Sequence, residues 1–182
     1  MMEEFRVDMR DMNEEDRTNY AKYGELVFKL NHTLPGSEEY VAIMKELFED
    51  RLGEGAFISA PMEGVALDRV TLGDRAFINS NCLLMARGGI TIEEDVMIAA
   101  NVQLITNNHD PYDRQVLICK PIVIKKGAWI GAGSSIMPGV TVGRYAIVGA
   151  SSVVTHDVGD YEVVVGSPAR CIKTLDAGKF ND

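Results

Sequence analysis

Aliphatic residues recur at every sixth position through the second half of the chain. The recurring positions are Ile124, Ile130, Ile136, Val142, Val148 and Val154. The fifth residue of each hexad is small or slender, and these residues are Ala128, Ser134, Val140, Ala146, Ser152 and Val158. Six residues are too few for a helix pair or a hairpin, but they fit one short strand and one corner of a solenoid. The pattern therefore predicts stacked coils around a continuous aliphatic column.

An earlier stretch keeps the same period, with one slip of two residues. Its aliphatic positions are Leu72, Ile78, Leu84, Ile92, Ile98 and Leu104. Residues 56–70 resemble a ragged first coil. The period fails over residues 105–121, where a polar segment with a proline predicts a protruding loop. We therefore expect a mainly β fold in which residues 56–165 form the solenoid.

Residues 1–55 are rich in Glu, Lys, Leu and Met and predict a helical element. Asn13 can cap a helix that runs to about Leu30, and the acidic residues after Asn13 suit the positive end of the helix dipole. Ser37 can cap a second helix. The apolar positions of this second helix follow the helical period and are Val41, Met44, Leu47 and Phe48. After the solenoid, residues 166–182 predict a turn and a short charged tail.

Composition limits the setting in which the chain works. Its 182 residues suit one domain with an appended element. No apolar run approaches a membrane span, and the acidic start lacks the apolar core of a secretory signal. The cysteines Cys82, Cys119 and Cys171 are widely spaced, which favours free thiols in a reducing cytoplasm over disulfides or a metal site.

Charge is distributed unevenly along the chain. The net charge of −9 argues against nucleic acid as a partner. Residues 1–70 hold 16 acidic and 8 basic side chains, a balance of −8, whereas residues 121–182 hold 5 acidic and 6 basic, a balance of +1. A phosphate-bearing ligand would therefore meet the C-terminal half. The cations there include Lys125, Lys126, Arg144, Arg170 and Lys173.

His109 is the residue best suited to proton transfer. It lies in the polar segment that interrupts the repeat, where a histidine can exchange a proton near neutral pH and activate an alcohol. An ordinary loop histidine is the alternative interpretation. A serine nucleophile and a metal find little support, because the serine pairs fit hexad corners and the three histidines are far apart.

The hexads resemble those of the hexapeptide-repeat acyltransferases, and the chain is similar to their galactoside and maltose O-acetyltransferase branch. The motifs that carry the resemblance are Phe28-x-x-Asn31-His32, Asn79-x-Asn81, the Asn-His-Asp-Pro segment at residues 108–111, Trp129-Ile-Gly-Ala-Gly and Gly166-x-Pro168-Ala-Arg170. The resemblance implies a left-handed parallel β-helix with three hexads per coil, so that the twelve anchors make about four coils. It also implies a homotrimer with sites between neighbouring copies.

The resemblance assigns roles to particular residues. His109 would be the general base, and Asp11 and Asn79 would hold the acceptor. On the coenzyme A side, it places Trp129 beside the pantetheine arm. The small corner residues Ser134, Ala150 and Ser152 would leave room for that arm, and the cations Arg170 and Lys173 suit the phosphates. We also expect a contact from Thr155. His156 stands where the family often has a lysine. Each residue also has a purely structural interpretation: Asp11 as a helix cap, Asn79 as a corner residue, and Trp129 as core or trimer packing.

The expected function is transfer of an acetyl group from acetyl-CoA to a hydroxyl of a sugar, with no metal. The acceptor would attack the thioester directly, and a backbone N–H near Ser134 would stabilise the oxyanion. Two alternatives remain. One is an acetyltransferase of the same fold that acts on an amino sugar, an amino acid or a xenobiotic, and the other is a non-catalytic trimeric scaffold.

Overall fold

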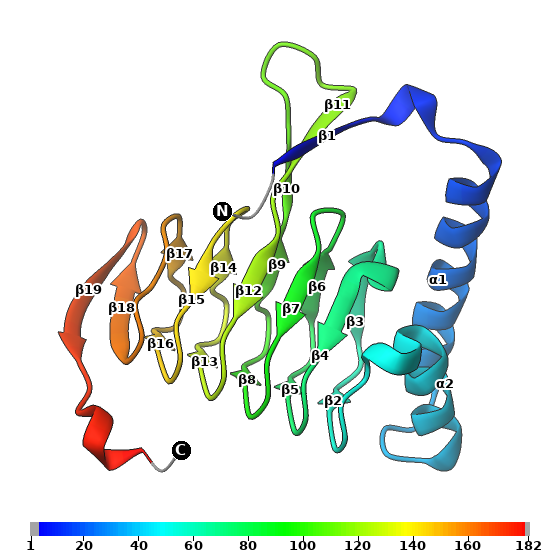
Figure 1. Ribbon diagram of the computed structural model, residues 1–182. Helices are drawn as coiled ribbons and strands as arrows, with labels where there is room; N and C mark the ends of the chain where they lie inside the picture. Colours follow the sequence, from blue (N-terminus) through cyan, green and yellow to red (C-terminus); the bar gives the residue numbers. More distant parts are fainter. Residues whose placement is uncertain (1–3, 181–182) are drawn as a thin grey trace.

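The computed structural model describes residues 4–180 and shows a parallel β-helix flanked by two helices at one end (Figure 1). Three parallel sheets form its sides. Sheet 1 contains β4 (Val70–Leu72), β7 (Ile90–Ile92), β12 (Ile122–Ile124) and β15 (Thr141–Val142). Sheet 2 contains β2 (Phe57–Ile58), β5 (Phe77–Ile78), β8 (Met97–Ile98), β13 (Trp129–Ile130), β16 (Ile147–Val148), β18 (Glu162–Gly166) and the antiparallel β19 (Ala169–Thr174). Sheet 3 contains β3 (Met62–Val65), β6 (Cys82–Met85), β9 (Gln103–Ile105), β14 (Ser135–Ile136) and β17 (Val153–Val154).

The hexad anchors form the core of this solenoid. All twelve anchors are buried, and so are the six small or slender residues of the later hexads. Leu72, Ile92, Ile124 and Val142 pair in successive strands of sheet 1, so the two-residue slip leaves the column in register. Sheet 3 has five stacked strands in the described chain, which gives about five coils. The predicted β-helix is confirmed, and its first coil is the ragged one.

Two helices pack against the first coils. α1 (Glu14–His32) begins with a capping box between Asn13 and Asp16, and α2 (Glu38–Phe48) is capped by the side chain of Ser37. Asn31, at the end of α1, exchanges hydrogen bonds of 2.8 and 2.9 Å with the backbone of Met62 in β3. The two predicted caps are therefore confirmed, and α1 is fixed to the solenoid at its C-terminal end.

The prediction of the apolar face of α2 was wrong at one residue. Val41 is exposed, whereas Tyr40 and Ile43 are buried together with Met44 and the two later apolar residues. The Tyr40 hydroxyl donates to the carbonyl of Ile58 at 2.7 Å, so the buried tyrosine keeps a hydrogen bond inside the core. Tyrosine fits such a position because its ring packs in the core while its hydroxyl finds a partner.

The polar interruption of the repeat is a β-hairpin, and the prediction of a loop was wrong in this respect. β10 (Asn107–His109) pairs antiparallel with β11 (Val116–Cys119), and β1 (Phe5–Asp8) adds a third antiparallel strand. Figure 1 shows this hairpin projecting from one side of the solenoid, with β1 beside β11. A short 3-10 helix, η1 (Met9–Asp11), leads from β1 towards α1.

The C-terminal segment also has more structure than the predicted turn and tail. β18 continues sheet 2, and β19 folds back on it as an antiparallel strand. After η4 (Ala177–Lys179), the ring of Phe180 packs on Tyr145 and Tyr161, with centroids 4.6 and 5.4 Å apart. These contacts attach the tail to the last coils. Within residues 4–180 no helix is long and apolar enough to cross a membrane.

Candidate active site

One corner of the solenoid departs from the hexad pattern in three successive coils. This irregular corner joins sheet 3 to sheet 1 and consists of residues 66–69, 86–89 and 106–121. The first contains η3 (Leu67–Arg69), the second contains Gly88 and Gly89, and the third contains the hairpin. The Gly88 N–H donates to the Thr106 hydroxyl at 2.7 Å, and that hydroxyl donates to the Met85 carbonyl, which ties the second coil to the root of the hairpin.

Gly88 is required for this close approach. A Cβ at this position would lie 2.6 Å from the Lys120 carbonyl oxygen and 2.8 Å from that of Thr106. Both neighbours are backbone atoms in adjacent coils, so they cannot move aside cheaply. The root of the hairpin is therefore held by backbone packing, which fixes the base of the strand that ends in His109.

His109 is exposed on the hairpin, and one of its ring nitrogens is committed. Nδ1 lies 2.6 Å from the Arg114 carbonyl oxygen. A carbonyl can only accept a hydrogen bond, so Nδ1 carries a proton, and in the neutral tautomer the lone pair is on Nε2. The hairpin thus orients the imidazole and selects Nε2 as the nitrogen that can accept a proton.

Asp110, next in sequence, organises the turn of the hairpin. Its buried carboxylate accepts hydrogen bonds from the backbone N–H groups of Tyr112 and Asp113, at 2.7 and 3.2 Å, and pairs with Arg6 of β1. The Tyr112 N–H, followed by the Arg6 guanidinium, lowers the pKa of Asp110 below its usual range. The carboxylate therefore stays charged at neutral pH and joins β1 to the hairpin.

A second charge cluster reinforces that link. Arg10 donates to Asp8 at 2.6 and 2.8 Å and to Asp113 of the hairpin at 2.7 Å. The hydrogen bonds from Arg10 lower the pKa of Asp8 to about 2. The sequence analysis did not single out Arg6, Arg10 or Asp110 for this role, because they meet only through a pairing of strands more than a hundred residues apart.

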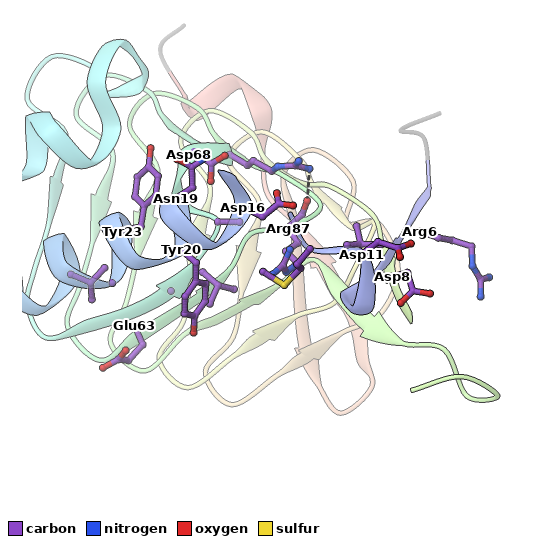
Figure 2. Close-up of a pocket in the computed structure, with 18 residues that line it drawn as sticks. Arg6, Asp8, Asp11, Asp16, Asn19, Tyr20, Tyr23, Glu63, Asp68 and Arg87 are labelled. Carbon is purple, nitrogen blue, oxygen red and sulfur yellow. Dashed lines mark hydrogen bonds between the residues drawn. The ribbon is translucent and has the colours of Figure 1, made fainter. Parts of the chain in front are cut away.

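A cavity of about 400 Å³ lies between β1, η1, α1 and the first coils. Asp11 lines it, and Figure 2 shows its side chain beside those of other polar residues from α1 and the corners. Asn13, not Asp11, caps α1, so the alternative interpretation of Asp11 as a helix cap is wrong. His109 is not among the lining residues, and the structure does not bring Asp11 and His109 into one cavity.

Asn79 and Trp129 lie on sheet 2 or its edge. Asn79 follows β5 at a corner, partly buried, and its side-chain oxygen accepts the Ser80 N–H at 2.8 Å. Its backbone keeps a negative φ, whereas Asn81 has the left-handed φ of 60°. Trp129 points outward with 47% of its surface exposed, so it is not core. It lies between Met97 and Ile147 on the neighbouring strands.

Comparison with known proteins identifies the family. The model described as "Bacterial transferase hexapeptide (six repeats)" matches residues 121–156, and "Hexapeptide repeat of succinyl-transferase" matches residues 69–105. Galactoside O-acetyltransferase of Escherichia coli (strain K12) is 31% identical over 157 residues, which cover 83% of this chain and 76% of the relative. The chain belongs to the hexapeptide-repeat acetyltransferases.

Solved structures of this family superpose on almost the whole chain. A hexapeptide-repeat acetyltransferase from Vibrio cholerae has a TM-score of 0.86 and 33% identity, covering 93% of this chain and 98% of its own. A galactoside acetyltransferase in complex with coenzyme A also has a TM-score of 0.86, with 29% identity, and covers 94% and 90%. The likeness includes the helical element as well as the coils.

The small corner residues predicted to leave room for acetyl-CoA include two serines, and their hydroxyls form hydrogen bonds inside the coils. Ser134 and Ser152 are fully buried. The Ser134 hydroxyl donates to the Gly149 carbonyl at 2.9 Å, and the Ser152 hydroxyl accepts the Gly166 N–H at 3.1 Å. The Ser134 N–H donates to the Gly131 carbonyl at 3.3 Å. The Ser152 N–H donates to the Ser134 hydroxyl at 3.3 Å, so neither serine presents an unbonded N–H or an exposed hydroxyl to a ligand in this chain.

The remaining predicted donor residues are exposed at the far end of the solenoid. Ala150 and Thr155 flank β17, and Arg170 and Lys173 lie on β19. Thr155 Oγ1 lies 2.9 Å from His156 Nδ1. Figure 1 shows β19 and the η1 segment that contains Asp11 at opposite ends of the molecule. Within one chain, Asp11, which is predicted to bind the acceptor, therefore lies far from Arg170 and Lys173, which are predicted to bind the phosphates. No cluster of His, Cys, Asp and Glu that could hold a metal ion occurs among the described residues.

Proposed function

We propose that the protein transfers an acetyl group from acetyl-CoA to a hydroxyl of a sugar or similar polyol, with His109 as general base. The observation that carries this proposal is the hydrogen bond from Nδ1 to the Arg114 carbonyl, which leaves Nε2 as the proton acceptor. The relatives named galactoside O-acetyltransferase support a sugar hydroxyl as the acceptor.

The proposed reaction is a direct transfer. Nε2 of His109 takes the acceptor proton while the acceptor oxygen attacks the thioester carbonyl. The carbon–sulfur bond of the tetrahedral species then breaks, and the imidazolium returns the proton to the leaving thiolate. No covalent acyl-enzyme is needed. Burial raises the pKa of the Cys82 and Cys119 thiols, which disfavours them as nucleophiles.

Asp11 and Asn79 are proposed to hold the acceptor. Asp11 is exposed to the cavity, where its carboxylate can accept hydrogen bonds from hydroxyl groups. Asn79 uses its side-chain oxygen locally, which leaves its NH₂ group able to donate to a ligand. Asp11→Ala should raise the Michaelis constant for the acceptor with little effect on that for acetyl-CoA.

The C-terminal coils are proposed to hold acetyl-CoA. Arg170 and Lys173 are exposed cations on one strand, and cations of this kind suit the phosphates of coenzyme A. Trp129, Ala150 and Thr155 offer exposed surface for the rest of the molecule, and the region around Ser134 and Ser152 can contribute backbone groups. Arg170→Ala and Lys173→Ala should each raise the Michaelis constant for acetyl-CoA more than that for the acceptor.

A homotrimer would join these two halves. Sheet 2 exposes a column of apolar side chains, with Phe77 37%, Met97 53% and Trp129 47% exposed. Apolar surface of this kind commonly meets a partner. A neighbouring copy seated between two solenoids could supply what one chain lacks at each site. Light scattering at micromolar concentration should give three times the chain mass, and a stable monomer would contradict this assembly.

The decisive experiment is an acceptor panel. Purified protein is mixed with acetyl-CoA and with sugars, amino sugars, amino acids and chloramphenicol-like alcohols, and thiol release is followed. Release with sugar hydroxyls and not with amines is expected. Preference for an amine would favour the N-acetylating alternative, and absence of both thiol release and coenzyme A binding would favour a scaffold. The three free cysteines suit a reducing compartment, so we place the reaction in the cytoplasm.

A further inference from the structure

Two arginines line the cavity without an acidic partner. Among the residues that the structure describes, neither Arg69 nor Arg87 forms an ion pair, whereas Arg6, which lines the same cavity, is held by Asp110. Arg69 and Arg87 come from the first and second turns of the irregular corner. The extra residues at this corner therefore bring two guanidinium groups to one cavity.

The hydrogen-bonding capacity of these two arginines is mostly unused. Within the described chain, the side chain of partly buried Arg87 has one polar contact, its Nη2 lying 4.0 Å from the thioether sulfur of Met12. Arg69 donates to the Arg87 carbonyl oxygen at 2.9 Å and lies over the Phe5 ring. A guanidinium has five N–H donors, and a thioether is a weak acceptor. Several donors are therefore left for a ligand.

Acidic residues in the same cavity can bind hydroxyl groups. Five carboxylates line it, and two are occupied, Asp8 by Arg10 and Asp16 by the N–H at the α1 cap. The others, Asp11, Glu63 and Asp68, form no ion pair within residues 4–180. The cavity thus offers carboxylates that accept hydrogen bonds from hydroxyl groups and guanidinium groups that donate to an oxyanion. A neutral sugar would leave the guanidinium groups unpaired, and a simple anion would leave the carboxylates unused.

The arginine pair also lies near the root of the hairpin that carries His109. Arg87 immediately precedes Gly88, whose N–H donates to the Thr106 hydroxyl at 2.7 Å and whose backbone packs on that of Lys120. Thr106 and Lys120 flank the first residue pair of the hairpin. Cys119 pairs with Asn107, two residues before His109. A group held by the arginines would therefore sit beside the element that positions the proposed base.

We propose that the acceptor is a polyol that bears an oxyanion, such as a sugar acid or a sugar phosphate, with Arg87 and Arg69 holding the oxyanion and Asp11 a hydroxyl. This rests on the proposed acetyl transfer and narrows its acceptor class. Arginine presents paired N–H groups that match carboxylate and phosphate oxygens. Arg87→Gln keeps a polar side chain but removes the charge, and Arg17→Gln, on the exposed start of α1, is the matched control.

The test compares glucuronate, glucose 6-phosphate and glucose as acceptors, by rate of thiol release and by calorimetric binding to the full-length protein. At least one of the two anions should exceed glucose in kcat/KM by tenfold or more, and which one does so identifies carboxylate or phosphate. Arg87→Gln should lower this preference by about tenfold to a hundredfold, the range for hydrogen bonds to charged groups. Arg87→Lys should restore part of it, and Arg17→Gln should change it by less than twofold.

The outcomes separate this inference from the proposed function. Acetylation of glucose with no anion preference, or a preference that Arg87→Gln leaves within threefold, would overturn the anionic acceptor while acetyl transfer stands. Calorimetric binding of the anions that depends on Arg87, without thiol release from any acceptor, would uphold the anion site and reject sugar acetylation. Circular dichroism of each variant establishes that a lost preference does not reflect unfolding.

Discussion

The three corners of the solenoid differ in how closely they keep the six-residue repeat. The two regular corners keep the hexad length in every coil, with residues in the left-handed conformation such as Asn81, Asp95, Asn101 and Ser151. The irregular corner breaks the length three times in succession and carries η3, Arg87 and the hairpin with His109. The regular corners keep the column continuous, and the irregular corner carries the proposed general base beside it.

This contrast suggests that stability and activity depend on different residues. The core is the buried aliphatic column, to which the side chains of the hairpin contribute little, since His109 is exposed and β10 and β11 pair outside the parallel sheets. The hairpin is held by backbone packing at Gly88 and by charged groups that link it to β1. Substitutions in the hairpin should therefore lower activity more than stability, and substitutions in the aliphatic column should do the reverse.

The largest effect is expected at the hairpin. His109→Ala should lower kcat by about two to four orders of magnitude, because it removes the proton acceptor, while the melting temperature changes little. Rates of thiol release with saturating substrates and a thermal melt provide the two readouts. His32→Ala, an exposed histidine on α1, is the control. Turnover within a few-fold of the parent would remove His109 from the mechanism.

The second-largest effect is expected in the buried aliphatic column. Ile130→Ala should destabilise the protein by about 2–5 kcal/mol, since a fully buried side chain is replaced by a cavity. The surviving folded enzyme should keep its Michaelis constants. Thr91→Ala, on an exposed position of β7, should cost about 1 kcal/mol or less. Denaturant titration measures both. Equal losses for the two variants would show that the column is not the main source of stability.

An intermediate effect is expected at the turn of the hairpin, where Asp110 links it to β1. Asp110→Ala removes two backbone hydrogen bonds and the Arg6 pair, so it should destabilise the hairpin and lower kcat by about tenfold without changing the Michaelis constant for acetyl-CoA. Arg6→Ala removes only the half-exposed guanidinium and leaves both backbone hydrogen bonds to Asp110, so it should destabilise the protein less than Asp110→Ala does.

The pH dependence of that pair has a definite sign. The folded-state pKa of Asp110 is lowered, so its contribution is complete above the unfolded value of about 4 and is lost as pH falls through the folded value. The difference in stability between the parent and Asp110→Ala should be constant from pH 6 to 8 and shrink in acid. A difference that instead changed across pH 6–8 would point to a group other than Asp110.

The smallest effect is expected for the exposed thiol. Cys171 is exposed on β19, whereas burial raises the pKa of Cys82 and Cys119. One cysteine should react quickly with a thiol reagent in the native protein, and Cys171→Ser should abolish that phase without changing kcat. A fast phase that persists in this variant would show that a buried thiol becomes accessible.

The sequence predicts the coils better than the corners, and the reason is physical. Each anchor contacts anchors one coil away, so the hexad period reports the core directly. The strand β1 could not be found this way, because its partner β11 lies more than a hundred residues further on and neither strand has a repeating pattern. The hand of the helix came from family resemblance, since parallel crossovers are otherwise nearly always right-handed.

For the candidate site, the sequence indicated candidate residues more readily than their arrangement in space. His109 was singled out by its polar surroundings, and its proposed role, like those of Asp11 and Asn79, came from family motifs. Arg87 was missed, although the two-residue slip around Gly88 and Gly89 marked its corner as irregular. Burial of the Ser134 and Ser152 hydroxyls could not be inferred, because a small residue suits an inward position and an open groove equally well.

The pairing of β1 with β11 also governs the order in which the molecule can be completed. A chain made from its amino end presents Phe5–Asp8 long before Val116–Cys119 exists, so β1 must wait while successive coils stack through contacts between near neighbours in sequence. Each coil can add to the one before it during synthesis. The strand that steadies the hairpin is thus made well before its partner, and until the two strands pair, the coils already stacked lack the hairpin in its held position.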